Sequence, residues 1–293
     1  MKDIYVVKAL DEKERFRFML VNSTSLVEEI RKIHNTTTTA TAALGRLSTM
    51  AAIMGTDIKN KNETLALKIK GDGPAGLLIA ECDSEGNIRS YMDHPEIDIP
   101  SRESDNKLDV GGFVGKNGLL SVIRDFGTAE PYIGKTAIVS GEIAEDIASY
   151  FFYSEQTPTI VSLGVLVDVD YSCISAGGLF IQVLPGYTES DLVELEEVMK
   201  DFPAVSSVFE KNEDAKDVLN KYFSSLNMKI LEEKPVRYQC SCSKDKVEKV
   251  IISLGKDQIE EIAREDQGAE IVCEFCNKKY NFTEEDLRSL TSN

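Results

Sequence analysis

The amino-acid sequence predicts an α+β fold with an N-terminal core domain, a helical linker and a small C-terminal domain. Three observations lead to this prediction. Alternating polar and apolar runs are mixed with helical stripes over residues 1–186, helical periodicity follows over 187–234, and four cysteines are concentrated in 235–293. Period-two runs predict strands and stripes of period 3.6 predict helices. We therefore expect an antiparallel sheet with helices in the core domain.

The first half of the core domain is expected to hold two strands, two helices and an antiparallel meander. A capping-box pattern from Ser25 to Glu28 predicts the start of the first helix, and Leu44, Leu47 and Met54 belong to an alanine-rich stripe that ends at Gly55. Gly-Asp-Gly-Pro and Ser-Glu-Gly turns separate the meander strands. Strands are predicted at residues 4–10, 16–21, 64–70, 77–83 and 87–92.

The second half of the core domain repeats the pattern and leads into the linker. Strands are predicted at 119–124, 136–140, 165–171 and 179–184, with a helix from about 142 to 153. In the linker, Thr188 and Asp191 predict a capped helix, and a second apolar stripe runs from Val218 to Leu226. These stripes either pack permanently on the core domain or form a detachable cover over an apolar surface. Helical periodicity does not distinguish these two alternatives.

Composition and charge limit the class of protein. The chain has 293 residues, is 42% hydrophobic and carries a net charge of -17. This charge opposes binding to nucleic acid or to an anionic membrane, and no basic patch offsets it. The N-terminus does not resemble a signal peptide, and no apolar run is long enough to span a membrane. We therefore expect a cytoplasmic protein with neither nucleic acid nor membrane as a partner.

The four C-terminal cysteines are the most specific pattern in the chain. Cys240 and Cys242 form a CxC motif, and Cys273 and Cys276 form a CxxC motif thirty residues later. Zn²⁺ accepts four thiolates in a tetrahedron, and two short cysteine pairs can surround one ion with little strain. No histidine follows His94, so imidazole from within this segment cannot complete the site. The pattern predicts one zinc ion per chain, and its binding is expected to fold residues 235–293.

Other candidate sites are weaker, and no positive sign of an enzyme remains. Cys82 and Cys173 lie in apolar stretches and are expected to be inert core residues. The segment 111–117 has three residues where a P-loop needs four, and it lacks the Ser or Thr that binds magnesium. His94 with the CxxC motif is reminiscent of zinc deaminases, but the two surplus cysteines would close the coordination sphere to catalytic water. His34 is expected to lie at the C-terminus of a helix, where a positive charge interacts favourably with the helix dipole.

The spacing of the four cysteines is by itself compatible with two roles for the zinc site. Most all-cysteine sites are permanent scaffolds, but zinc-bound thiolates also stay nucleophilic toward an oxidant that reaches them. A redox switch is thus the second reading of the same four residues.

The cysteine segment resembles the redox switch of the heat-shock protein 33 family. The resemblance rests on Cys240-Ser-Cys242-Ser243, Leu254-Gly255, Val272-Cys-Glu-Phe-Cys276 and Tyr280. It continues upstream in Ala43-Leu-Gly-Arg46, Gly71-Asp-Gly-Pro74, Ser154-Glu-Gln-Thr-Pro158, Ala176-Gly-Gly178, Gln182 and Leu184-Pro-Gly186. It therefore spans nearly the whole chain.

The resemblance implies a redox-regulated, ATP-independent holdase chaperone of the oxidative stress response, which binds unfolded proteins. In the reduced state, the four cysteines would hold zinc in an inactive monomer. Oxidation would form the disulfides Cys240–Cys242 and Cys273–Cys276, release zinc, unfold the switch and linker, and give an active homodimer. The CxC disulfide ring would be the more strained of the two.

Two rival functions belong to other classes. The first is a zinc-ribbon adaptor that stays folded and docks nucleic acid or a protein partner. The acidic balance of residues 233–293, with ten basic and thirteen acidic side chains, argues against nucleic acid. The second is a thiol–disulfide oxidoreductase, which the missing thioredoxin-like βαβ context of the CxxC motif makes a weaker reading.

Overall fold

The computed structural model describes residues 4–127 and 130–291, and the chain divides into two compact units. Residues 1–238 belong to the first unit and residues 239–293 to the second. The predicted α+β class is confirmed, because runs of mostly antiparallel strands are followed by runs of helices along the chain. No helix among these residues is both long enough and apolar enough to cross a membrane.

The first unit is built on one mixed sheet, which has ten strands in the described part of the chain. Its strands are β1 (Ile4–Leu10), β2 (Phe16–Asn22), β3 (Thr64–Lys70), β4 (Leu77–Asp83), β5 (Asn87–Met92), β6 (Leu119–Asp125), β7 (Tyr132–Ala137), β8 (Thr159–Val167), β9 (Cys173–Val183) and β10 (Lys229–Tyr238). The spatial order is β7-β6-β3-β4-β5-β10-β1-β2-β9-β8. Only the pairing of β10 with β5 is parallel. The last strand along the chain thus joins two groups of earlier strands.

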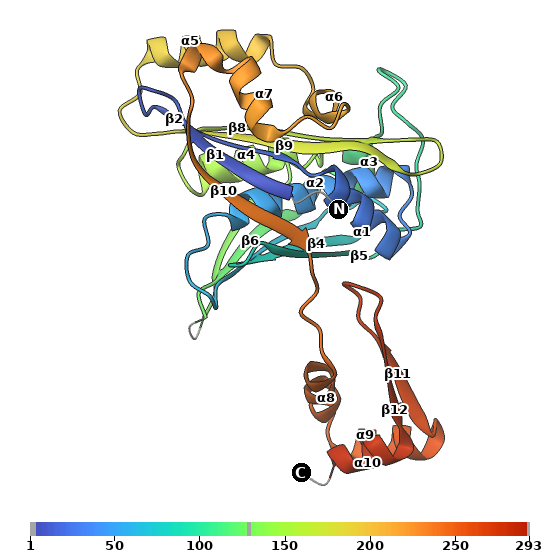
Figure 1. Cartoon of the computed structure of the whole chain (residues 1–293). Helices are drawn as coiled ribbons and strands as arrows, with labels where there is room; N and C mark the ends of the chain where they lie inside the picture. Colours follow the sequence, from blue (N-terminus) through green and yellow to red (C-terminus); the bar gives the residue numbers. More distant parts are fainter. Residues whose placement is uncertain (1–3, 128–129, 292–293) are drawn as a thin grey trace. The chain divides into compact units, whose positions relative to one another are not determined.

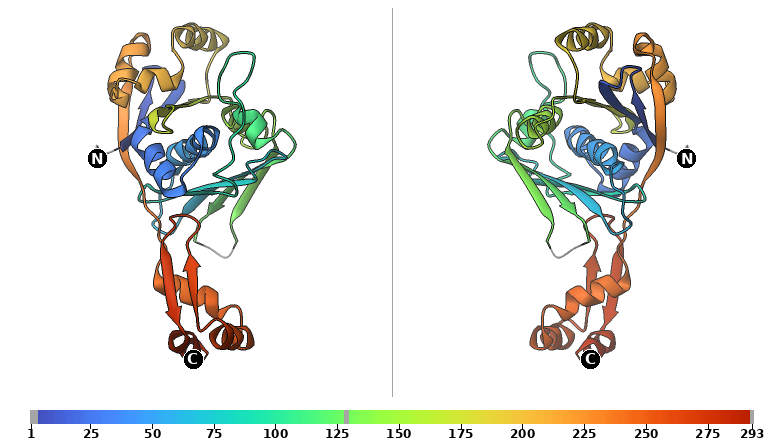
Figure 2. Two further views of the ribbon diagram at one scale, coloured as in Figure 1. Left: turned by 90° about the vertical axis from the view of Figure 1, so that its right-hand side faces the viewer. Right: turned by 90° about the vertical axis from the view of Figure 1, so that its left-hand side faces the viewer.

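The two groups of strands enclose a helical layer, as Figures 1 and 2 show. Helix α2 (Thr38–Gly55) is its centre and contacts strands of both groups, including β4 and β8. All residues of α2 except Thr38 and Arg46 are buried, which explains its alanine-rich sequence. Three further helices, α1 (Thr24–His34), α3 (Val110–Val114) and α4 (Ala144–Tyr153), complete this layer. The main core of the first unit lies around α2.

Strand β10 is tied to the centre of the first unit as well as to its neighbours in the sheet. It pairs with β1 along its length, from Ile4 opposite Val236 to Leu10 opposite Lys229, but with β5 at only two positions. The ammonium group of Lys234 lies 3.2 Å from the carbonyl oxygen of Ile58, just beyond the C-terminus of α2. A lysine near the last carbonyls of a helix is favourable to the helix dipole.

The linker helices cover the outer face of strands β1, β2 and β9 (Figure 1). These elements are α5 (Glu189–Lys200), α6 (Val205–Phe209), α7 (Ala215–Tyr222) and the 3₁₀ turn η1 (Ser224–Leu226). Thr188 and Asp191 form the predicted capping box of α5. Phe209 of α6 is 1% exposed and its ring packs so closely on Gly177 that a Cβ atom there would lie 2.3 Å from it. The apolar stripes of the linker therefore pack on the core strands in this structure.

The second unit is a small α+β module with its own apolar cluster. It contains α8 (Lys244–Ile252), α9 (Lys256–Glu265), the hairpin strands β11 (Gly268–Val272) and β12 (Lys279–Thr283), and α10 (Glu284–Leu290). Its buried residues are Ile251, Ile259, Ala263, Tyr280, Phe282 and Leu287. A cluster of this size gives a chain segment little stability without a further cross-link.

Several predicted elements need correction. The strand expected at 165–171 is the end of β8, which begins six residues earlier at Thr159 and ends at Val167, and Tyr171 takes a left-handed conformation in the turn that follows. The strand expected at 136–140 is β7, which begins four residues earlier and ends three residues earlier, at Ala137. The expected capping box at Ser25 is wrong, since α1 begins at Thr24 without a side-chain cap. The segment 111–117, which does not match a P-loop, overlaps the short helix α3.

Several elements were not predicted, among them the short helices α3 and α6. Strand β10 occupies a region where only helices were expected, because its sequence is rich in charge and contains Pro235, both of which oppose strand assignment. The hairpin partner β12 and helix α10 also escaped prediction. The structure groups residues 187–238 with the first unit, while the functional division at 186 and 234 stays a prediction.

Candidate metal centre

The second unit brings the four predicted cysteines together from two separate segments. Cys240 and Cys242 follow strand β10, and Cys242 directly precedes Ser243, whose hydroxyl caps the N-terminus of α8. Cys273 and Cys276 lie in the turn of the β11–β12 hairpin. Helix α8 and the hairpin thus each carry one cysteine pair to the same place.

The hairpin turn that carries Cys273 and Cys276 is closed by backbone hydrogen bonds. The amide of Cys276 donates to the carbonyl oxygen of Cys273 at 3.2 Å, and the amide of Cys273 donates to the carbonyl oxygen of Lys278 at 3.0 Å. Asn277 takes the left-handed conformation that closes the turn, with φ of 56°. Asparagine tolerates this conformation better than most residues, so the local sequence suits the turn.

The sulfur positions fit a tetrahedral metal ion. The Sγ atoms of Cys240 and Cys273 are 3.7 Å apart, those of Cys242 and Cys276 are 3.4 Å apart, and all four lie within 4.8 Å of one another. Zn–S bonds of about 2.3 Å in a regular tetrahedron give sulfur separations of about 3.8 Å. Four thiolates are also the soft donor set that selects zinc over hard cations. The four cysteines could therefore hold one metal ion.

The protonation of the cysteines is shaped by burial and by neighbouring hydrogen bonds. Burial raises the pKa of Cys240 and that of Cys276. Burial also acts on Cys242, but hydrogen bonds from Tyr280 and from the neighbouring thiols outweigh it and lower the pKa of Cys242 to about 7. A thiol with a pKa near neutrality gives up its proton to a metal ion at little cost.

One contact at this centre was missed by sequence reasoning. The hydroxyl of Tyr280 donates a hydrogen bond to the Sγ atom of Cys242 at 3.1 Å. Tyr280 and Phe282 alternate along β12 and both face the apolar cluster. This alternation is the sequence signal that could have indicated an inward-facing Tyr280, a residue that the family resemblance had already singled out without assigning it a contact.

The remaining cysteines and both histidines belong to the first unit and not to the unit that holds the candidate centre. Cys82 and Cys173 are both in the first unit and buried, and burial is the main cause that raises the pKa of each to about 12. Thiols with such pKa values stay protonated and unreactive at neutral pH. His34 is the buried last residue of α1, and His94 lies with its Nδ1 atom 3.7 Å from the carboxylate of Glu96.

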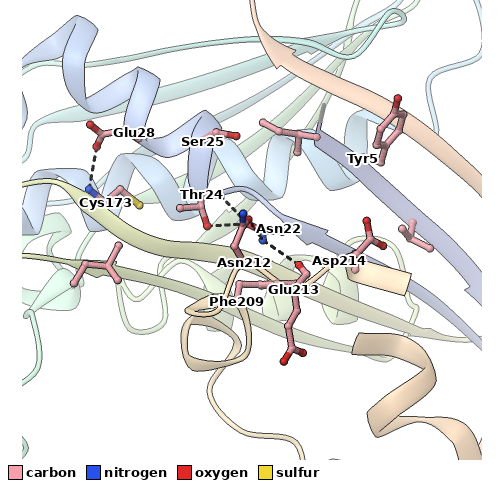
Figure 3. A pocket seen from close by; sticks show the side chains of 14 residues that line it. Tyr5, Asn22, Thr24, Ser25, Glu28, Cys173, Phe209, Asn212, Glu213 and Asp214 are labelled. Carbon is pink, nitrogen blue, oxygen red and sulfur yellow. Dashed lines mark hydrogen bonds between the residues drawn. The ribbon is translucent and has the colours of Figure 1, made fainter. Parts of the chain in front are cut away.

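A cavity of about 500 Å³ in the first unit is a second candidate site (Figure 3). Its walls carry the carboxylates of Glu28, Glu213 and Asp214. Each carboxylate already has a partner, because Glu28 accepts from Arg31, Glu213 lies 3.4 Å from the ammonium of Lys221, and Asp214 caps α7. Cys173 also lines this cavity, and its raised pKa keeps the thiol protonated.

Comparisons with known proteins agree over the whole chain. The family model described as Hsp33 protein matches residues 5–283. The 33 kDa chaperonin of Oceanobacillus iheyensis is 41% identical over 290 residues, which cover 99% of each chain. The 33 kDa chaperonin of Acetivibrio thermocellus is 42% identical over 286 residues, which cover 98% of this chain and 96% of the relative.

A solved structure shows the same relationship in three dimensions. The crystal structure of the 33 kDa chaperonin (heat shock protein 33 homolog) from Thermotoga maritima matches with a TM-score of 0.89 and 34% identity. The match covers 100% of this chain and 98% of that one. Sequence and structure therefore agree with the resemblance carried by the cysteine motifs, and the chain belongs to the Hsp33 family.

Proposed function

We propose that this protein is a redox-regulated, ATP-independent holdase chaperone that captures unfolding proteins under oxidative stress. The observation that carries the proposal is the cluster of four thiols within 4.8 Å in a unit with only a small apolar core. Membership of a family whose relatives are named 33 kDa chaperonin supports the chaperone activity. The protein would act as a cytoplasmic monomer when reduced and as a homodimer when oxidised.

In the reduced state, Cys240, Cys242, Cys273 and Cys276 would hold one zinc ion. Bound zinc would keep the four sulfurs deprotonated and cross-link α8 to the β11–β12 hairpin. The cysteines themselves then act as structural ligands and as sensors, because a thiolate is the form that reacts with peroxide.

Oxidation would proceed on the same four sulfurs. A cysteine thiolate attacks one peroxide oxygen, forms a sulfenic acid and releases hydroxide. The neighbouring thiolate then attacks the sulfenic sulfur, which closes the disulfide and releases a second hydroxide. Two peroxide molecules would accept four electrons and leave the disulfides Cys240–Cys242 and Cys273–Cys276. Disulfide sulfurs are poor metal ligands, so zinc would leave.

Loss of the metal would remove the main cross-link of the second unit. Its six buried residues are few, so we expect residues 239–293 to unfold. Strand β10 ends at Tyr238, two residues before Cys240, so unfolding of the cysteine segment would act on the strand that follows the linker helices. In this view, residues 1–186 are the core domain, 187–234 the linker and 235–293 the switch.

The surface for client proteins would lie beneath the linker helices. Buried apolar side chains from both sides form this contact, among them Phe18 and Leu20 of β2, and Phe209 and Leu219 of the linker. Detachment of α5, α6 and α7 would expose these side chains to water, and unfolded chains offer the apolar partners that would cover them again. The net charge of -17 would help to keep such complexes soluble.

The experiment that tests this function follows zinc and client protein in one tube. Reduced, zinc-loaded protein is titrated with hydrogen peroxide under mild heat, a metallochromic dye reports zinc, and light scattering reports aggregation of a denatured client. We expect zinc release and client protection to rise together and to reverse with a thiol reductant. Cys82→Ala and Cys173→Ala are matched controls that should behave like the original protein, because both thiols are buried in the first unit.

Two outcomes would contradict the proposal. If zinc leaves and the client is not protected, the four cysteines would have only a structural role. Zinc that stays bound, together with salt-sensitive binding of RNA or DNA, would favour the zinc-ribbon adaptor instead.

A further inference from the structure

Tyr280 connects the hairpin to the cysteine pair that lies on the other segment of the metal centre. It is opposite Ile271 in the β11–β12 pairing, and its side chain is 7% exposed within the apolar cluster of the second unit. Its hydroxyl nevertheless reaches the Sγ atom of Cys242, a residue 38 positions earlier, at 3.1 Å. The ring is fixed by packing, so the direction of its hydroxyl group is fixed as well.

The surroundings of Tyr280 make it a good hydrogen-bond donor to a thiolate. The ammonium group of Lys278 lies 5.2 Å from the centroid of the tyrosine ring. A cation over the ring withdraws electron density from it and so strengthens the O–H as a donor. A hydrogen bond to sulfur removes charge from the atom that would attack an electrophile, so the sulfur becomes a weaker nucleophile.

We propose that Tyr280 is a positioning residue of the four-cysteine centre, which orients Cys242 and makes it less reactive toward electrophiles than it would otherwise be. This inference rests on the zinc assignment in the proposed function. Partners in the second shell of a metal site hold its ligands in place and commonly change metal affinity by about 10–100-fold when they are removed. Tyr280 would thus do two things at one sulfur: keep Cys242 aimed at the metal and slow its attack on oxidants.

The alternative is a purely structural role, in which the Tyr280 hydroxyl only satisfies its own hydrogen-bonding need within a packed core. Buried tyrosine hydroxyls usually have a hydrogen-bond partner, and the ring itself contributes to the apolar cluster. The two roles differ in which cysteines become more reactive when the Tyr280 hydroxyl is removed. A structural role predicts that all four cysteines become more reactive together, whereas a positioning role predicts a change that is concentrated at Cys242.

The test uses the full-length, reduced, zinc-loaded protein and the variant Tyr280→Phe, which removes the hydroxyl and keeps the ring. Each protein is treated with short pulses of N-ethylmaleimide, and mass spectrometry of peptides gives a modification rate for each cysteine. We expect the rate at Cys242 to rise about 3–10-fold, and those at Cys240, Cys273 and Cys276 to change less than about twofold. Tyr91→Phe is the matched control, because it removes a tyrosine hydroxyl that donates to Asp93 in the first unit.

A second measurement keeps the inference testable if Tyr280→Phe binds zinc too weakly for the pulse experiment. Both proteins are loaded with Co²⁺, and the sulfur-to-cobalt charge-transfer bands are compared. Loss of a hydrogen bond to one sulfur should shift these bands to lower energy, while Tyr91→Phe should leave them unchanged. Equal band positions, or an equal rise in the reactivity of all four cysteines, would overturn the inference. Neither readout needs chaperone activity, so a failure here is distinct from a failure of the holdase proposal.

Discussion

Replacing Phe209 by alanine should loosen the linker while the metal centre stays intact. Phe209 is 1% exposed, lies in the cluster between the linker helices and strands β1, β2 and β9, and packs on Gly177. Truncation of a buried phenylalanine to alanine typically costs about 3–5 kcal/mol. Phe209 also lies beside the 500 Å³ cavity of the first unit, so neighbouring groups have room to relax after the ring is removed. We therefore expect a cost at the low end, about 3 kcal/mol.

A loss of about 3 kcal/mol would raise the population of the detached linker by about two orders of magnitude. Reduced, zinc-loaded Phe209→Ala should accordingly protect a denatured client before any oxidant is added. Hydrogen exchange read by mass spectrometry should show faster exchange over residues 189–226, where the linker helices lie. Zinc content should stay at one ion per chain, since the cysteines are in the other unit.

The control for this prediction is Phe113→Ala. Phe113 is fully buried in the main core around α2 and belongs to a different apolar cluster, so its loss should destabilise the first unit without selective release of the linker. The reasoning is refuted if exchange over 189–226 is no faster in Phe209→Ala than in Phe113→Ala. It is also refuted if the linker opens in Phe209→Ala and clients still aggregate.

Two further predictions concern metal removal and acid. Chelation of zinc from the reduced protein should unfold residues 239–293 and leave the first unit folded, which hydrogen exchange resolved by peptide would detect. Equal protection of residues 239–293 with and without metal would contradict this. Hydrogen bonds from Arg31 lower the pKa of Glu28 to about 2 from its ordinary value of 4.5. Because the folded-state pKa is depressed, the stabilisation is complete above pH 4.5 and is lost as the pH falls toward 2. Glu28→Gln should cost the first unit about 1 kcal/mol at pH 7 in urea unfolding, and its stability should depend less on pH between 4.5 and 2.

The sequence predicted the elements whose signals are local. Strands β3, β4 and β5 have the expected bounds, because glycine-rich turns interrupt a clear alternation on both sides. Helix α2 was equally clear, since its alanine-rich stripe is buried on all sides. Side-chain period and turn chemistry are properties of short segments, so one sequence is enough to read them.

What could not be predicted depends on contacts between distant segments. Strand β10 buries only Val236 fully and is otherwise charged or partly exposed, so its place in the sheet follows from pairing with β1 and not from its own residues. The candidate site likewise has one part that the sequence predicts and one part that depends on long-range packing. Spacing indicated the four cysteines as one cluster, but the contact of Tyr280 with Cys242 depends on how the hairpin packs beside the CxC segment.

The position of β10 also has a consequence for the order of events during synthesis. Ile4 pairs with Val236, so 232 residues of chain must be made before the first strand meets this partner. Until then, β1 and β5 each present an unpaired edge while the chain is still attached to the ribosome. Such long-range pairing is slow because the loop must close before the contacts form, and open strand edges invite aggregation. The sheet of the first unit can therefore close only after most of the chain has been made.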